Sequence, residues 1–211
     1  MEISWLGHSC LRIRSNEVTL ITDPYDESLG LSMGRQRADI VTISHQHPHH
    51  AHYAAIKGNP RVLRSPGEYE IANFYITGMG TDRNDDEGEP KINTIFVIQG
   101  EGLTLCHLGD LNRALSPRQI EELSQTDILF VPAGGVCTAS TSRVAELVNL
   151  VDPKIVVPMH YQTGSAKVDI QPLDPFLDDM GVTEPARHSR LSVTASSLPR
   201  ELRVTVLEQD A

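Results

Sequence analysis

The stretch SHQHPHHAH, residues 44–52, directly follows the apolar run Ile40–Ile43 and holds five of the nine histidines of the chain. A short apolar run of this kind predicts a buried strand, so the histidines lie where that strand turns into a loop. Neutral imidazole is a common ligand for zinc and similar ions. His45, His47 and His50 stand at positions i, i+2 and i+5, from which side chains can converge on one ion. A solvated polar loop is the alternative, but clusters this dense are typical of metal sites.

Two other segments place polar side chains just after an apolar run. The segment HLGD, residues 107–110, carries Asp110 in a turn, where a carboxylate could bridge two cations. The segment PMHY, residues 158–161, carries His160 in the same position relative to its run. Taken alone, Asp110 could cap backbone amides and His160 could be structural. Together with the histidine stretch they predict one shared site, because active-site groups often emerge from one edge of a sheet.

Short apolar runs along the chain predict strands, with helices between the later ones. The expected strands are Ile3–Leu6, Cys10–Ile13, Val18–Ile21, Ile40–Ile43, Arg61–Leu63, Phe74–Ile76, Thr94–Ile98, Leu103–Leu108, Ile128–Val131, Ile155–Val157, a strand at Val193, and Leu202–Leu207. The expected helices are Pro117–Leu123 after the N-cap Ser116, Thr141–Val151, and Pro172–Met180 before Gly181. Residues 82–90, DRNDDEGEP, predict an exposed acidic loop. This order favours packed sheets with helices outside.

Composition restricts the class of protein. The chain has 211 residues, 39% of them hydrophobic and 22% charged, which is typical of a single globular domain. The net charge of −10 disfavours a nucleic-acid partner, because such binding depends on basic side chains that neutralise phosphates. No apolar run is long enough to span a membrane, and the N-terminus lacks the pattern of a secretory signal, so we expect a cytoplasmic protein. Cys10, Cys106 and Cys137 are expected to be buried, reduced thiols.

Several motifs occur in a fixed order from residue 5 to residue 161. They are WLGHS at 5–9, TDP at 22–24, SHQHPHH at 44–50, LGD at 108–110 and PMHY at 158–161. The ordered set resembles the metallo-β-lactamase superfamily, and within it the branch that opens with Trp-Leu-Gly-His, which is similar to sugar-lactone hydrolases. Each motif alone is weakly specific, and the resemblance rests on their order over most of the chain.

The resemblance implies a four-layer αβ/βα sandwich, a single domain over residues 1–211 and a centre of one or two metal ions. The metal ligands it implies are His45, His47, His49, His50, Asp110 and His160. Zinc is the expected ion, while manganese, nickel and iron stay open, because His and Asp ligands discriminate poorly among them. Such an ion lowers the pKa of bound water from about 15.7 toward about 7. The resemblance therefore implies a metal-bound hydroxide that attacks a small ester, lactone or phosphodiester, with His49 or Asp110 as proton acceptor.

Two positions depart from the family's pattern. The family has an Asp where this chain has His49, and imidazole carries no negative charge. The family also has a third metal histidine in the loop before the Gly-Asp strand. Here that segment is Gly80–Asp85 without histidine, and Arg83 stands about where the histidine would fall. An arginine would repel a cation, so one metal site is expected to be incomplete, with Asp82 or Asp85 as substitutes.

The remaining candidates are expected to support the centre or to contact substrate. They are His8, Arg83, His107 and Tyr161, and His107 could also replace the missing ligand. His52 and His188 are expected at the surface.

Three functions follow from these residues. The first is a metal-dependent hydrolase acting on a small, phosphorylated or cyclic substrate. The second is a degenerate, non-catalytic relative that binds an anionic ligand or a partner, since Arg83 suits an anion such as phosphate. The third is a nuclease, which the net charge disfavours. A homo-oligomer stays open.

Overall fold

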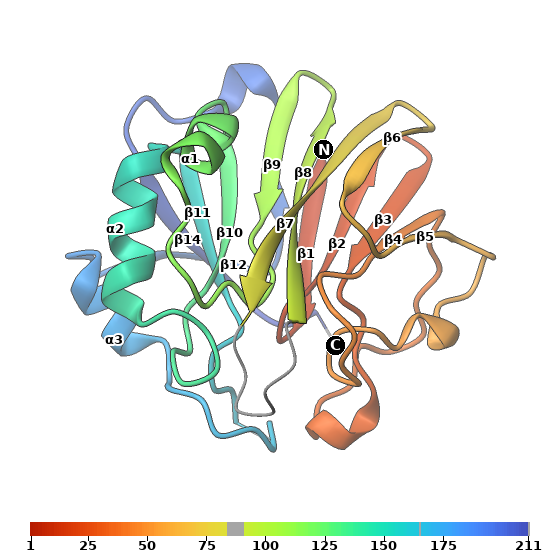
Figure 1. The fold of residues 1–211 in the computed structure, drawn as a ribbon, viewed down its shortest axis with the longest axis horizontal. Coiled ribbons are helices and arrows are strands. Elements are labelled where there is room, and N and C mark those ends of the chain that lie inside the picture. The colour runs from red at the N-terminus through yellow and green to blue at the C-terminus, as the bar shows by residue number, and fades with distance from the viewer. Residues whose placement is uncertain (84–90, 165, 211) are drawn as a thin grey trace.

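Two β-sheets pack face to face and carry three α-helices on one outer side (Figure 1). The computed structural model describes residues 1–83, 91–164 and 166–210. The first sheet has six strands in the order β13-β1-β2-β3-β4-β5. Its strands are β1 Glu2–Gly7, β2 Cys10–Ser15, β3 Val18–Thr22, β4 Ile40–Thr42, β5 Arg61–Leu63 and β13 Leu191–Ser192.

The second sheet has eight strands in the order β12-β14-β11-β10-β9-β8-β7-β6. They are β6 Gly67–Ile71, β7 Phe74–Arg83, β8 Lys91–Gly100, β9 Leu103–His107, β10 Ile128–Pro132, β11 Ile155–Met159, β12 Ala186–His188 and β14 Arg203–Leu207. The neighbours β9, β10, β11 and β14 run parallel, and β6 to β9 run antiparallel. The hairpin between β8 and β9 turns at Glu101 and Gly102, which both have positive φ, as a tight hairpin turn requires.

Helices α1 Pro117–Leu123, α2 Thr141–Val151 and α3 Asp174–Asp179 lie together outside the second sheet (Figure 1). Ser116 caps α1 in a capping box with Gln119, as its sequence predicts. The predicted α/β sandwich is confirmed. On the outer side of the first sheet, however, loops and the short 3-10 helices η1 Glu27–Leu29 and η2 Tyr53–Ala55 cover a small apolar cluster. A further 3-10 turn, η3, spans Ala195–Ser197.

Several boundaries differ from the predictions. The third helix starts two residues late, because the backbone of Gln171 pairs with Gly134 and Gln162 instead of entering the helix. Strand β7 continues to Arg83, so residues Gly80–Arg83 pair with β8 and do not form a loop. The rest of the predicted acidic loop lies outside the described residues. Edge strands β6 and β12 are polar and exposed, so they lack the apolar pattern that predicts strands.

Smaller differences concern Val193 and the cysteines. Val193 itself is not in a strand, since β13 ends one residue earlier, although its amide still bonds the carbonyl of Met1. Cys10 and Cys106 are buried free thiols as predicted, but Cys137 is exposed. Cys137 sits in the turn after β10, next to Val136 at φ +45°, and this turn carries it out of the core. None of the helices among the described residues combines the length and the apolar composition that crossing a membrane requires.

The packing of α3 gives a stability prediction. Phe176 is fully buried in the main core, so Phe176→Ala should lower the free energy of unfolding by about 3–5 kcal/mol. Leu150→Ala on the exposed side of α2 should change it by less than about 0.5 kcal/mol, since Leu150 is 55% exposed. Urea unfolding followed by circular dichroism measures both. Equal losses for the two variants would contradict the placement of α3.

Candidate metal centre

The histidine loop after β4 is anchored by the buried carboxylate of Asp23. Asp23 follows β3, and β3 and β4 are parallel neighbours, so the two strand ends lie side by side. Asp23 Oδ1 accepts a hydrogen bond from the amide of Ser44 at 2.7 Å, and Oδ2 accepts one from the hydroxyl of Ser44 at 2.5 Å. These bonds fix the first turn of the loop.

The same carboxylate sets the tautomers of two histidines. His50 Nδ1 lies 3.0 Å from Asp23 Oδ2 and donates its proton to it, which leaves the lone pair on Nε2. The single hydroxyl proton of Ser44 goes to Asp23, so Ser44 Oγ must accept from His45 Nδ1, 3.0 Å away. The lone pair of His45 therefore also resides on Nε2. Hydrogen bonds to the outer nitrogen of a ligand histidine are a general feature of metal sites.

Asp110 is fixed by the turn that follows β9. Its amide donates to Asn93 Oδ1 at 2.9 Å, and Asn93 Nδ2 donates to the carbonyl of Leu108 at 3.0 Å. Gly109 has φ +58°, and a Cβ there would come within 2.4 Å of Asn93 Oδ1 and 2.6 Å of Ser44 Cβ. Only glycine fits this close approach, and the turn brings Asp110 against the histidine loop.

His8 and His160 come from the ends of β1 and β11 and belong to different sheets. Their φ angles are +52° and +53°, in the left-handed region that non-glycine residues rarely occupy. The amide of His160 donates to the carbonyl of His8 at 3.0 Å, and Trp5 Nε1 donates to the same carbonyl at 2.8 Å. These bonds hold both imidazoles in the space between the sheets.

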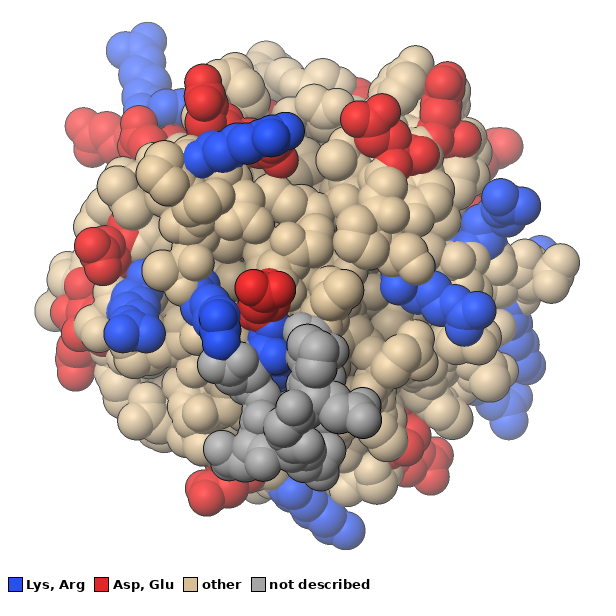
Figure 2. All heavy atoms as spheres, in the orientation of Figure 1, with Lys and Arg blue, Asp and Glu red and all other residues tan. Residues whose placement is uncertain are grey.

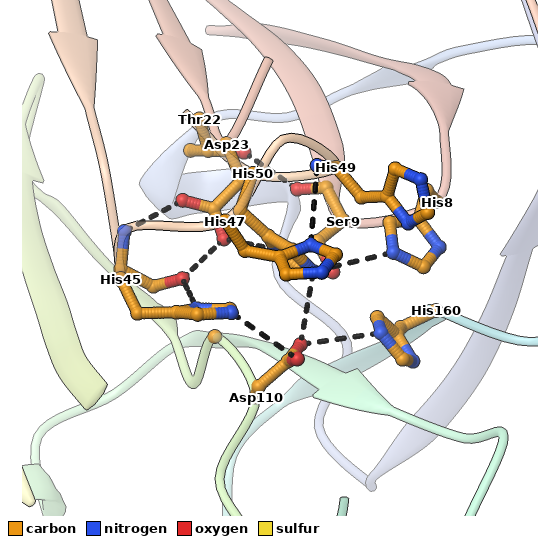
Figure 3. A network of polar contacts seen from close by, with 12 residues as sticks. His8, Ser9, Thr22, Asp23, His45, His47, His49, His50, Asp110 and His160 are labelled. Carbon is orange, nitrogen blue, oxygen red and sulfur yellow. Dashed lines mark hydrogen bonds and ion pairs between the residues drawn. The ribbon is translucent and has the colours of Figure 1, made fainter. Parts of the chain in front are cut away.

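The carboxylate of Asp110 lies at the centre of these side chains (Figure 3). Its Oδ1 is 3.2 Å from His160 Nε2 and 3.4 Å from His50 Nε2. Its Oδ2 is 3.6 Å from His45 Nε2. His8 Nε2 is 3.2 Å from His50 Nε2. Asp110 and the four histidines His8, His45, His50 and His160 are all buried.

These separations fit donor atoms arranged around a cation. Atoms bound to one tetrahedral zinc ion at about 2.0–2.1 Å lie about 3.3 Å from each other. The Nε2 lone pairs of His45 and His50 face a carboxylate, which is repulsive unless a positive charge lies between them. His45 Nε2 and Asp110 Oδ1 are buried without a hydrogen-bond partner among the described residues. The donor set and its unsatisfied atoms therefore fit a divalent metal ion.

The protonation states of these groups at neutral pH favour binding of a cation. Burial lowers the pKa of His45 and of His50 to about 3, so both imidazoles are neutral and keep an unprotonated Nε2. Burial works against ionisation of Asp110, but His160, His50 and His45 outweigh it and hold its pKa well below the usual range. Burial alone would lower the pKa of His160, yet the Asp110 carboxylate raises it to about 9. Without a metal, a proton on His160 offsets this carboxylate together with the guanidinium of Arg83.

Comparison with known proteins identifies the family. The family model described as the beta-lactamase superfamily domain matches residues 2–160, a span that reaches from β1 to His160. The chain belongs to the β-lactamase superfamily.

Relatives of this chain carry names that describe metal-dependent hydrolysis. The Nanoarchaeum equitans protein named UPF0173 metal-dependent hydrolase is 31% identical over 193 residues, covering 77% of this chain and 85% of that protein. A Lysinibacillus sphaericus protein of the same name is 28% identical over 198 residues, covering 77% and 86%. A Thermotoga maritima structure, proposed to be a Zn-dependent hydrolase of the metallo-beta-lactamase superfamily, is 36% identical with a TM-score of 0.81. It covers 98% of this chain and 97% of its own.

His47 and His49 differ in how close they lie to the donor atoms of this centre. His47 is exposed, and one of its ring nitrogens lies within 4.8 Å of ligand atoms of His45 and His50. His49 lies outside the ligand groups that the described residues form, and its Nε2 is 3.1 Å from Ser28 Oγ. The structure thus does not bring His49 to the donor atoms, because its ring is engaged with the loop that carries η1.

Arg83 reaches the centre from the end of β7. Its Nη2 lies 3.4 Å from Asp110 Oδ2, the oxygen that also faces His45. The side chain is 12% exposed. Asp82 beside it is exposed, and Asp85 lies outside the described residues. The structure thus brings Arg83 into contact with Asp110; its correspondence to a family histidine stays a prediction from the sequence.

The other candidates lie around the centre. His107 is fully buried; its Nε2 donates to the carbonyl of Ser9 at 2.9 Å, and its Nδ1 accepts from the amide of Gly109 at 3.3 Å. Its described hydrogen bonds thus go to backbone, and none reaches a ligand side chain. Tyr161 stacks on Trp5 with ring centroids 5.0 Å apart, and burial raises the pKa of its hydroxyl to about 12. His52 and His188 are exposed, as expected.

Four residues near the centre were not among the sequence candidates. Asp23 and Ser44 belong to motifs recognised in the sequence, but the role of Asp23 in setting tautomers depends on the parallel pairing of β3 and β4. Asn93 lies inside an ordinary strand pattern that gives no signal. Cys137 has its sulfur within 4.8 Å of ligand atoms of Asp110 and His160, and no sequence pattern indicated it.

The role of Asp23 gives a test of the centre. Asp23→Asn removes the charge that orders His45 and His50, so it should weaken metal binding about 10- to 100-fold while the chain still folds. Asp26→Asn is the matched control, because Asp26 is an exposed carboxylate in the neighbouring loop. Isothermal titration with zinc gives both affinities, and unchanged affinity in Asp23→Asn would refute this role.

Proposed function

We propose that this chain is a metal-dependent hydrolase acting on a small molecule that contains an ester, lactone or phosphodiester bond. The observation that carries the proposal is the buried Asp110 carboxylate faced by the unprotonated Nε2 atoms of His45 and His50. The names of the relatives support the hydrolase class and leave the substrate open. The likeness to sugar-lactone hydrolases stays a prediction from the sequence motifs.

The residues that would hold the ion are His50, His160 and Asp110, with His45 and His47 on the neighbouring side. Imidazole and carboxylate suit zinc first, and manganese, nickel and iron remain compatible. When bound, such an ion supplies a Lewis acid and lowers the pKa of water.

The chain's own residues then have distinct tasks. Asp23 keeps the Nδ1 protons of His50 and, through Ser44, of His45 in place, so that both Nε2 atoms stay available. The low pKa of Asp110 favours it as a ligand for a cation. Proton acceptance by Asp110 or by His49 stays a prediction, and His49 would act from outside the donor cluster.

Partners and location are proposed from charge and composition. On the face in Figure 2, acidic and basic side chains are mixed over most of the surface, and several basic side chains gather along its right side. The net charge of −10 over the whole chain supports a small-molecule substrate over a nucleic acid. The cytoplasmic location stays a prediction.

Asp110→Asn tests the hydrolase proposal. Loss of this charge should abolish stoichiometric metal binding and reduce hydrolysis to the rate of the blank, because the amide cannot offset a divalent charge. Elemental analysis of the untagged protein and assays with ester, lactone and phosphodiester panels measure the two effects. Glu122→Gln on the surface of α1 is the matched control. Hydrolysis at the unmodified rate by Asp110→Asn would contradict the proposal.

A second candidate function is binding of an anion without turnover. The observation that favours it is Arg83, whose Nε is buried without a partner among the described residues while Nη2 faces Asp110. A phosphate or carboxylate oxygen would satisfy this donor.

Thermal denaturation separates the two functions. If the chain is a metal-dependent enzyme, a chelator should lower its melting temperature and zinc should restore it, because a ligand that binds only the folded state stabilises it. Stabilisation by phosphate together with indifference to the chelator would favour the anion-binding function instead.

A further inference from the structure

We propose that this centre holds a single metal ion on the Oδ1 side of Asp110, with His8 as one of its ligands, and that Arg83 takes the place of a second ion on the Oδ2 side. The inference rests on the proposed metal dependence and adds the number of ions, their place and two residues with defined tasks.

The Oδ1 side has the spacing of a complete ligand set. The distances from Asp110 Oδ1 to His160 Nε2 and His50 Nε2 are 3.2 and 3.4 Å, and His50 Nε2 lies 3.2 Å from His8 Nε2. All three are close to the edge of about 3.3 Å expected for a tetrahedron around zinc. Ligand nitrogens of His8, His50 and His160 also lie within 4.8 Å of one another.

The backbone around His8 supports a functional role for this side chain. His8 and His160 both adopt left-handed φ angles and are tied together by a backbone hydrogen bond. Uncommon backbone angles at non-glycine residues persist where surrounding structure enforces them, often at functional sites. His8 is 3% exposed, and its ring lies 4.0 Å from the ring of His160, measured between centroids. His8 thus fills the place that His49 leaves, since His49 bonds to Ser28.

Four protein ligands do not close this site to catalysis. Catalytic zinc sites usually have three protein ligands and an open position, and some expand to five ligands in the transition state, so turnover at this site would need such a fifth position.

The Oδ2 side already contains a fixed positive charge. The Arg83 guanidinium lies 3.4 Å from Asp110 Oδ2, on the oxygen that an ion bound to His45 and His47 would share. The guanidinium is a cation, so a metal ion bound at this oxygen would lie against a like charge. The described carboxylates within this cluster are Asp110 and Asp23, and a second divalent ion would add two further positive charges. Repulsion between charges a few ångströms apart in a buried site therefore disfavours a second ion.

The experiment counts ions in the untagged full-length chain and in three variants. Each protein is stripped with a chelator, reloaded with zinc, and measured by elemental analysis and calorimetric titration. The unmodified chain and Arg83→Lys, which keeps the charge, should bind one ion per chain. Arg83→Gln, which removes the charge, should bind two. Two ions of similar affinity in the unmodified chain, or one ion in Arg83→Gln, would overturn the role of Arg83.

His8→Ala tests the ligand role separately. It should still bind one ion, but at least about 10-fold more weakly, with a changed visible spectrum when cobalt replaces zinc. Unchanged affinity and an unchanged cobalt spectrum would show that His8 is only a hydrogen-bond partner of His50.

Hydrolysis is assayed on the same samples and keeps the two proposals apart. The expected ion counts without hydrolysis would refute the proposed function and leave this inference standing. Hydrolysis by a chain that binds two equivalent ions would support the proposed function and refute this inference. A folded chain that binds no zinc would refute both.

Discussion

The buried carboxylate of Asp110 is the constraint on which the rest of the centre depends. A negative charge inside a protein is costly unless cations or donors surround it. Here three histidines, His45, His50 and His160, and Arg83 lie against it, and the unprotonated Nε2 atoms of His45 and His50 face it. Arg83 supplies a positive charge at Oδ2, and the donors at Oδ1 are stabilised by a second cation, either a proton on His160 or a metal ion.

The fold brings these groups together through strand ends. The ends of β1, β3 and β4 in one sheet and of β7, β9 and β11 in the other converge where the sheets meet. The turns after these strands use strained or glycine-only backbone at His8, Asp23, Gly109 and His160. The core beneath is apolar and close-packed, so these turns are held by the rigid strands that precede them. Precise placement of ligands on such elements is what a metal site requires.

The sequence was sufficient for part of this account. Apolar runs followed by polar residues correctly indicated the strands before His45, Asp110 and His160, and the sandwich they form. Edge strand β6 was missed, because its residues are mostly exposed and its stability comes from pairing with β7.

Side-chain direction within the centre could not be derived from the sequence. The motif placed His49 among the ligands, but in the structure its ring turns toward Ser28. The contact of Arg83 with Asp110 depends on β7 extending to Arg83. The acidic, turn-rich composition of residues 82–90 predicted a loop there instead. The joint control of His45 and His50 by Asp23 depends on hydrogen bonds across parallel strands.

Anomalous diffraction from crystals of the zinc-loaded chain tests the central claim most directly. A strong peak is expected about 2.0–2.2 Å from Asp110 Oδ1 and from the Nε2 atoms of His50 and His160. Strong anomalous density confined to surface histidines, with Asp110 and its neighbours in contact with no ion, would contradict it.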